Sequence, residues 1–230
     1  APSSIGLGIT YSVDCCKKLQ AASYLQRRNP YIKLYDIDED YNFSTVVDTD
    51  LALDNTVYDL KFYGDNYLIV GGDFTNYLQV FKYENGDYTK LTNNIDILPT
   101  GRVWDIEYNN GYIFIASEVS PYILIYKVVG DNLVKLDNPT NLPADKAYSI
   151  DVNDVGRLIA VGITGSPYIK TYKFYDEVLT DFSVDLAPTQ TNITWAVKFI
   201  GNNFLYVGGD LAVYKYKVNT ESWLQAYSAC

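Results

Sequence analysis

Residues 57–91 read VYDLKFYGDNYLIVGGDFTNYLQVFKYENGDYTKL and contain four short runs rich in Val, Ile, Leu, Tyr and Phe. Such runs, bounded by turn residues, are typical of β-strands. The Asn, Asp and Gly residues between them tolerate the positive φ of tight hairpin turns. The stretch therefore predicts one four-stranded antiparallel unit. Its expected strands are 57–62, 67–71, 77–83 and 88–91.

The same pattern recurs along the chain in two signatures. The first is an aromatic residue followed by polar, aliphatic, polar and apolar residues, and it begins at Tyr11, Tyr58, Trp104, Tyr148 and Trp195. The second is an extended run that ends in an aromatic residue, at Tyr35, Phe81, Tyr126, Tyr172 and Tyr214. The spacings are 47, 46, 44 and 47 for the first signature and 46, 45, 46 and 42 for the second. Four strands repeated at this period are typical of β-propeller blades.

We therefore predict an all-β fold, in which residues 1–230 form a single five-bladed β-propeller domain with four antiparallel strands per blade. The period and the turn residues place the blade boundaries in the polar linkers. The predicted blades are 9–52, 53–98, 99–143, 144–188 and 189–230.

These repeats resemble WD-repeat and YVTN-type propeller repeats. The runs Tyr67-Leu-Ile-Val-Gly-Gly-Asp73 and Phe204-Leu-Tyr-Val-Gly-Gly-Asp210 match the order that these repeats share. The runs Ser120-Pro-Tyr-Ile-Leu-Ile-Tyr-Lys127 and Ser166-Pro-Tyr-Ile-Lys-Thr-Tyr-Lys173 look like propeller repeats of phage virion and secreted microbial proteins. The chain is similar to five-bladed, tachylectin-type lectins in size, although it lacks their sugar-binding motif. The resemblance implies the fold and no particular activity, because propellers host many unrelated functions.

Composition excludes several functional classes. The formal net charge of −10 opposes binding to phosphate backbones, so we expect no nucleic-acid partner. No apolar run approaches the ~20 residues of a membrane-spanning helix, so we expect no membrane insertion. The chain contains no histidine, which removes histidine-based triads and histidine-ligated metal sites. We expect no cofactor and no metal.

Charged residues on the innermost strand of each blade admit two interpretations. Asp14, Lys61, Glu107, Asp151 and Lys198 occupy one equivalent position. A second equivalent position holds Ser12, Asp59, Asp105, Ser149 and Ala196. A pair of carboxylates could serve a glycoside hydrolase as acid and as base or nucleophile. We favour a polar ring in which lysines and acids pair, because these positions follow the repeat and an active site should break it.

Aromatic residues are the main binding candidates. The aromatic residues of the first signature, Trp104 and Trp195 among them, could stack on sugar rings or wedge neighbouring blades together. Tyr31, Tyr122 and Tyr168 follow prolines at the start of a strand. They are candidates for glycan contact, with simple packing as the alternative.

Three cysteines suggest a covalent contact. Cys15 matches apolar positions of the other repeats, whereas Cys16 falls in a turn and Cys230 follows the last strand. In a propeller Cys16 and Cys230 would lie on opposite faces, too far apart for an intramolecular bond. We expect a head-to-tail bond between molecules, with an intramolecular staple and free thiols as alternatives. The first blade holds a basic cluster of Lys17, Lys18, Arg27, Arg28 and Lys33, and the stretch that follows, residues 36–54, holds seven acidic and no basic residues. Patches of opposite charge on one molecule favour heterologous self-association.

The sequence ranks three functions. The first is a non-enzymatic structural or surface protein that self-assembles into a filament or virion, in an extracellular, virion or cell-surface location. The second is a glycan-binding lectin or adhesin module, and the third is a glycoside hydrolase. Sequons at Asn42 and Asn192 permit N-glycosylation, although about two such matches are expected by chance.

Overall fold

The computed structural model describes residues 9–15, 19–25, 32–37, 43–45, 51, 53–64, 66–85, 87–182, 190–210, 212–217 and 225–227. Residues 1–103 with 130–133 form one compact unit, and residues 104–129 with 134–230 form a second. No helix among the described residues has the length and hydrophobicity needed to cross a bilayer.

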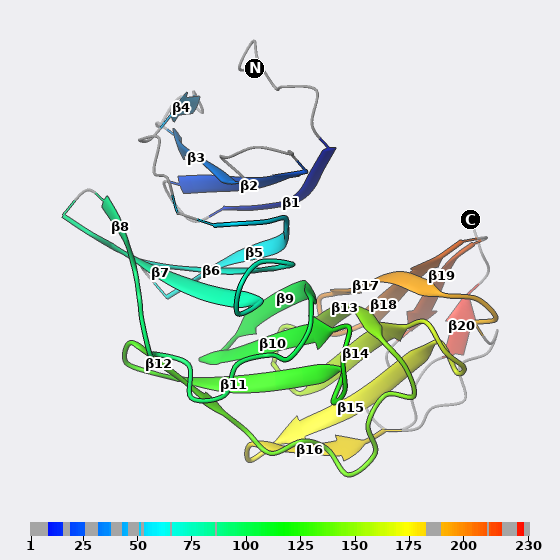
Figure 1. Ribbon diagram of the computed structural model, residues 1–230. Coiled ribbons are helices and arrows are strands. Elements are labelled where there is room, and N and C mark those ends of the chain that lie inside the picture. Colours follow the sequence, from blue (N-terminus) through cyan, green and yellow to red (C-terminus); the bar gives the residue numbers. More distant parts are fainter. Residues whose placement is uncertain are drawn as a thin grey trace. The chain divides into compact units, whose positions relative to one another are not determined.

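The described residues form strands and no helix, which confirms the all-β prediction (Figure 1). The strands of the first two repeats are β1 (Ile9–Cys15), β2 (Leu19–Leu25), β3 (Ile32–Ile37), β4 (Phe43–Thr45), β5 (Val57–Tyr63), β6 (Tyr67–Gly72), β7 (Leu78–Glu84) and β8 (Asp87–Lys90). Those of the third and fourth are β9 (Val103–Asn109), β10 (Tyr112–Ser117), β11 (Ile123–Val129), β12 (Asn132–Lys135), β13 (Ala147–Val152), β14 (Leu158–Ile163), β15 (Ile169–Tyr175) and β16 (Val178–Asp181). The last repeat has β17 (Thr194–Ile200), β18 (Phe204–Gly209), β19 (Val213–Lys217) and β20 (Gln225–Tyr227).

Each repeat forms its own sheet, in which strands that follow one another in the sequence lie side by side. The order is β1-β2-β3-β4 in the first sheet, and the same meander recurs in the others, as in a propeller. Strand ends differ from the sequence prediction in the second repeat by one residue at most. Alternating polar and apolar residues bounded by Asn/Asp/Gly turns were therefore sufficient to locate the strands.

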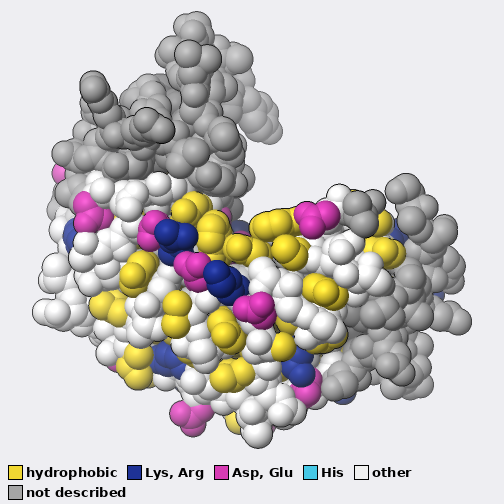
Figure 2. All heavy atoms as spheres, turned by 45° about the vertical axis from the view of Figure 1, so that its right-hand side comes forward, with side chains coloured by type: hydrophobic (Ala, Val, Ile, Leu, Met, Phe, Trp, Pro, Cys, Tyr) yellow, Lys and Arg dark blue, Asp and Glu magenta, His cyan; other side chains and the backbone are white. Residues whose placement is uncertain are grey.

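The second strand is buried on both faces in the second, third and fourth repeats. In β6, β10 and β14 every residue after the first is buried. This pattern is expected when sheets pack face to face with the second and third strands at the centre. In the second unit a core cluster joins Phe114 of β10 and Ile125 of β11 with Ile159 and Phe174 of the next sheet. The surface is mixed: on the face in Figure 2, hydrophobic side chains lie scattered among basic and acidic ones.

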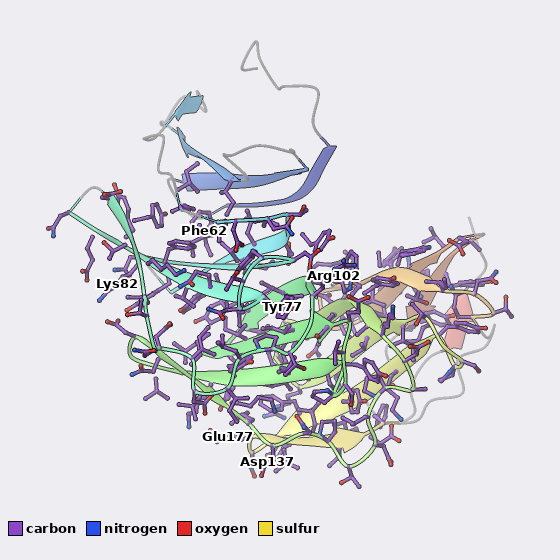
Figure 3. The ribbon with its side chains drawn as sticks, viewed as in Figure 1. Phe62, Tyr77, Lys82, Arg102, Asp137 and Glu177 are labelled. Carbon is purple, nitrogen blue, oxygen red and sulfur yellow. The ribbon has the colours of Figure 1, made fainter. Side chains whose placement is uncertain are left out.

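Two polar contacts, which we call latches, repeat at the outer ends of the sheets. In the first unit Tyr67 and Lys82 lie opposite each other in the β6–β7 ladder, and both bind the Asp131 carboxylate. In the second unit Tyr112 and Lys127 are paired in the same way, and both bind Glu177, at 3.1 and 2.5 Å. Lys82 and Glu177 are labelled in Figure 3. The carboxylate comes from the third hairpin of the following repeat in both cases.

The last repeat corrects one detail of the sequence alignment. Tyr126, Tyr172 and Tyr216 are fully buried, and Tyr172 and Tyr216 pair with equivalent residues of the preceding strand. Tyr216 therefore takes the position that the sequence pattern assigned to Tyr214, which is only half-buried. The reason is the connection before the third strand, because 210–212 is two residues shorter than 164–168 in the preceding repeat.

This register gives a direct stability prediction. Tyr216→Ala should lower the free energy of unfolding by about 3–5 kcal/mol, because a fully buried aromatic ring is lost and a cavity remains. Tyr214→Ala should cost much less, since that side chain is half-buried. Urea denaturation of both variants measures the difference. Equal losses would contradict the register.

Candidate binding site on the inner strands

The aromatic residue of the first signature sits at a β-bulge. In β5, Val57 and Asp59 pair with Gly72 and Gly71, so Tyr58 between them has no partner in the ladder. In β13 and β17 the same shift leaves out Tyr148 and Trp195. A bulge inserts one extra residue and redirects its side chain. The fold therefore aims this aromatic residue away from the regular faces of the sheet in at least three repeats.

Three of these aromatic residues form a continuous row in the second unit. Trp104 of β9 meets Tyr148 of β13 edge-on, with ring centroids 4.9 Å apart and planes at 78°. Tyr148 in turn lies 4.8 Å from Trp195 of β17, with planes at 30°. Trp195 is 48% exposed, and its indole N–H donates a hydrogen bond to the Asp210 carboxylate. The row therefore ends in an accessible indole of fixed orientation.

Polar groups border this row. Lys146, two residues before Tyr148, forms an ion pair with Glu118 at 3.0 Å. The hydrogen bond and charge of Glu118 raise the pKa of Lys146. Asp145 accepts a hydrogen bond from the Lys146 backbone N–H, and this bond lowers the pKa of Asp145. Lys146 thus interacts with Tyr148 of the row and with two carboxylates, and such polar groups can bind hydroxyl groups.

Side chains of the inner strands also accept hydrogen bonds from the inner strand of the next repeat. Asp105 of β9 accepts hydrogen bonds from the Ser149 hydroxyl and the Ile150 N–H, both at 2.8 Å. Ser149 of β13 accepts one from the Val197 N–H at 3.1 Å. The inner strand is the edge of its sheet, so its outward N–H groups need such partners. We call this series the inner-strand ladder.

The ladder continues with an ion pair between the buried Asp151 and the exposed Lys198. Asp151 accepts hydrogen bonds from the Phe199 N–H and from the Lys198 ammonium group, which lies 2.6 Å away. Lys198 also lies 3.3 Å from Glu107. Burial raises the pKa of Asp151 to about 6, although Lys198 and the Phe199 N–H oppose the shift. For Lys198, burial disfavours the charge, but the two carboxylates outweigh it and raise its pKa.

These contacts favour the paired polar ring over a catalytic pair of carboxylates. Both oxygens of Asp105 and of Asp151 accept hydrogen bonds from the neighbouring backbone or side chains. A general acid or a nucleophile must instead reach the substrate. Within the described part of the chain, no three His, Cys, Asp or Glu side chains are arranged to hold a metal ion.

The other predicted site residues have mixed outcomes. Tyr122 and Tyr168 follow cis prolines and have φ values of 64° and 67°. Tyr122 is partly buried against the core cluster of its unit, which supports the packing alternative there, and Tyr168 is half-buried. Glycan contact at these two residues stays a prediction. Asn192 is half-buried in the connection before β17.

Several predictions concern residues outside the described ranges. Tyr31, Cys16, Cys230 and Asn42 lie there, and for Cys15 the structure describes only the backbone, at the end of β1. Sequence reasoning missed Asp210 as a partner of Trp195. Asp210 ends the Leu-Tyr-Val-Gly-Gly-Asp run that identified the repeat. Its position directly after the second strand was the sequence signal that could have indicated this contact.

Comparisons with known proteins bear on the fold alone. No family model matches the sequence, and no curated protein matches it. The computationally designed Ika8 protein is similar over 98% of this chain and 63% of its own, with a TM-score of 0.67 and 12% identity. A Bacteroides fragilis protein, provisionally named a 6-phosphogluconolactonase, is similar over 93% of this chain and 67% of its own, with a TM-score of 0.69 and 10% identity. These likenesses support a propeller-like arrangement of the sheets.

The ion pair of Asp151 predicts a pH-dependent stability effect. The folded-state pKa of Asp151, about 6, exceeds its ordinary 3.8. The stability that this carboxyl contributes is therefore full below about pH 4 and is lost as pH rises through 6. Lys198→Met removes the partner and raises this pKa further. The variant should lose about 1–3 kcal/mol of unfolding free energy at pH 8 and clearly less at pH 5.

The measurement is urea denaturation at both pH values. Lys198 is 60% exposed, so water replaces part of the interaction and we expect the lower end of this range. Lys90→Met, at an exposed position of β8, is the matched control for the loss of one positive charge. An equal loss at pH 5 and pH 8 would show that Asp151 does not need Lys198.

Proposed function

We propose that the chain is a five-bladed β-propeller and acts as a non-enzymatic module that binds neutral carbohydrate at its inner strands. The aromatic row that ends in Trp195 carries the proposal. An indole held by a neighbouring ring and by a hydrogen bond presents a rigid apolar face at little entropic cost. Sugar rings have apolar faces that pack on such a surface, and their hydroxyl groups suit the bordering carboxylates.

The charge of the site favours a neutral ligand. Asp210 binds the Trp195 indole, and Glu118 and Asp145 both contact Lys146, two residues before Tyr148. The chain as a whole carries a formal charge of −10. Acidic glycans would be repelled by this field. Both carboxylate oxygens of Asp105 and of Asp151 already accept hydrogen bonds within the inner-strand ladder. This supports binding of the carbohydrate without its hydrolysis. The same binding role matches the lectin-like alternative from the sequence.

The five-bladed ring extends the aromatic row. Tyr11 and Tyr58 occupy the repeat position of Trp104, Tyr148 and Trp195. In a closed ring the five residues would surround the mouth of the central channel. Closure would also leave no unpaired sheet edge at the ends of the repeat array.

Closure is tested by small-angle X-ray scattering. A compact ring of 230 residues should have a radius of gyration of about 17 Å. An open arc of five sheets would give a clearly larger value and would contradict closure. The measurement is made with a reducing agent present, so that disulfide-linked species do not contribute.

Carbohydrate binding is tested by affinity electrophoresis in native gels that contain hydroxyethyl cellulose, xylan or galactomannan. The wild-type protein should be retarded in at least one of these gels and not in an anionic pectin gel. Trp195→Ala should lose the retardation, with a loss in affinity of more than about tenfold, as for an aromatic hot-spot residue. Tyr175→Ala removes another exposed aromatic side chain and should bind normally.

Thermal denaturation separates binding from folding. Trp195→Ala should keep a melting temperature close to that of the wild type, because its side chain is 48% exposed. Migration of the wild type unchanged in every neutral gel would overturn the proposal. Head-to-tail assembly through Cys16 and Cys230 concerns residues outside the described ranges and stays a prediction.

A further inference from the structure

A pocket lies in the fourth repeat between the β13–β14 turn and the end of β15, and Asn202 of the fifth repeat also lines it. Its volume is about 530 Å³, within the range of small-molecule sites. Val155, Leu158, Phe174 and Tyr175 give it apolar walls, and Arg157 and Lys173 add two positive charges. The pocket lies within the second unit and shares no lining residue with the aromatic row.

The pocket lies where the latch pattern of the second and third repeats changes. The ladder pairs Tyr67 with Lys82 and Tyr112 with Lys127. In the fourth repeat the equivalent pair is Leu158 with Lys173. The lysine is retained while the tyrosine, with its ring and hydroxyl, is replaced by a smaller apolar side chain. Both Leu158 and Lys173 line the pocket.

The two intact latches show what this lysine position binds. Lys82 binds the Asp131 carboxylate, and Lys127 binds that of Glu177. In the fourth repeat Lys173 lies over the Phe182 ring, 4.1 Å from its centroid. The Arg157 guanidinium lies over the Tyr175 ring, 5.3 Å from its centroid. Cations placed on aromatic rings keep their charge available to an anion.

We propose that this pocket binds a small amphiphilic carboxylate. Lys173, assisted by Arg157, binds the carboxylate, as the equivalent lysines bind Asp131 and Glu177. The apolar tail packs against Leu158 and Phe174, in space that the tyrosine ring fills in the second and third repeats. The inference does not depend on the proposed carbohydrate site.

Octanoate and its neutral analogue octan-1-ol are the probes. Titration of the ¹⁵N-labelled 230-residue chain should show saturable shifts of backbone amides in 153–158 and 173–180. For a ligand of this size we expect an octanoate dissociation constant of about 0.1–1 mM. Octan-1-ol should bind about tenfold more weakly, because it lacks the charge that forms the hydrogen bonds.

Two variants address the geometry. Leu158→Tyr restores the residue of the other latches, so the variant should fold, fill the pocket and abolish the octanoate shifts. Lys173→Gln should weaken octanoate about tenfold and leave octan-1-ol unchanged. Lys90→Gln is the charge-matched control and should bind both probes like the wild type.

Three results would overturn the proposal. One is the absence of octanoate shifts at the pocket, and another is equal affinity for octanoate and octan-1-ol. The third concerns Glu221, which corresponds in sequence to Glu177 and Asp131. If octanoate binds to Glu221→Gln but not to the wild type, Lys173 binds the Glu221 carboxylate of the chain itself and not that of a ligand.

Discussion

The inner strand of each sheet is an edge, and its outward N–H groups must find acceptors. In the second unit the acceptors are side chains of the preceding repeat. Asp105 accepts a hydrogen bond from the Ile150 N–H. In the same way, Ser149 accepts one from the Val197 N–H, and Asp151 accepts one from the Phe199 N–H. An unsatisfied buried N–H group costs about 1–3 kcal/mol, so each acceptor is a condition for packing one sheet against the next. The polar positions of the first signature thus have a structural origin.

This constraint also determines where function can reside. A carboxylate that already binds backbone N–H groups and an ammonium group is poorly placed to donate a proton or attack a substrate. The aromatic residue next to it is not under the same constraint. The bulge places Trp195 and Tyr148 outside the ladder, so they can vary between Tyr and Trp without loss of a backbone hydrogen bond. Recognition at the aromatic row and packing at the ladder are therefore separable.

The sequence was most informative where the repeat is strict. The period and the Asn/Asp/Gly turns located the strands of the second repeat to within one residue, because hairpin turns and alternation are local properties. The pairing of Lys198 with Asp151 followed from equivalent positions of opposite charge. The error at Tyr214 arose where 210–212 is shorter than its counterpart, since spacing alone does not reveal which residue of a strand faces the core.

Side-chain contacts between residues distant in sequence were harder to predict than the pairing of neighbouring strands. The bond from Trp195 to Asp210, the latches and the pocket beside Leu158 all depend on side chains that are distant in sequence and meet only after the sheets form. A single sequence gives no signal for such pairs unless they repeat. The latches do repeat, and their comparison identifies Leu158 as a departure in the repeat that follows them. In a repeat fold, the residues that bind a neighbouring sheet are constrained by that contact. A substitution at one such position changes the local surface, while the same contact in other repeats still holds their sheets together. A position substituted in this way can therefore form a ligand-binding site that is present in one repeat and absent from the others.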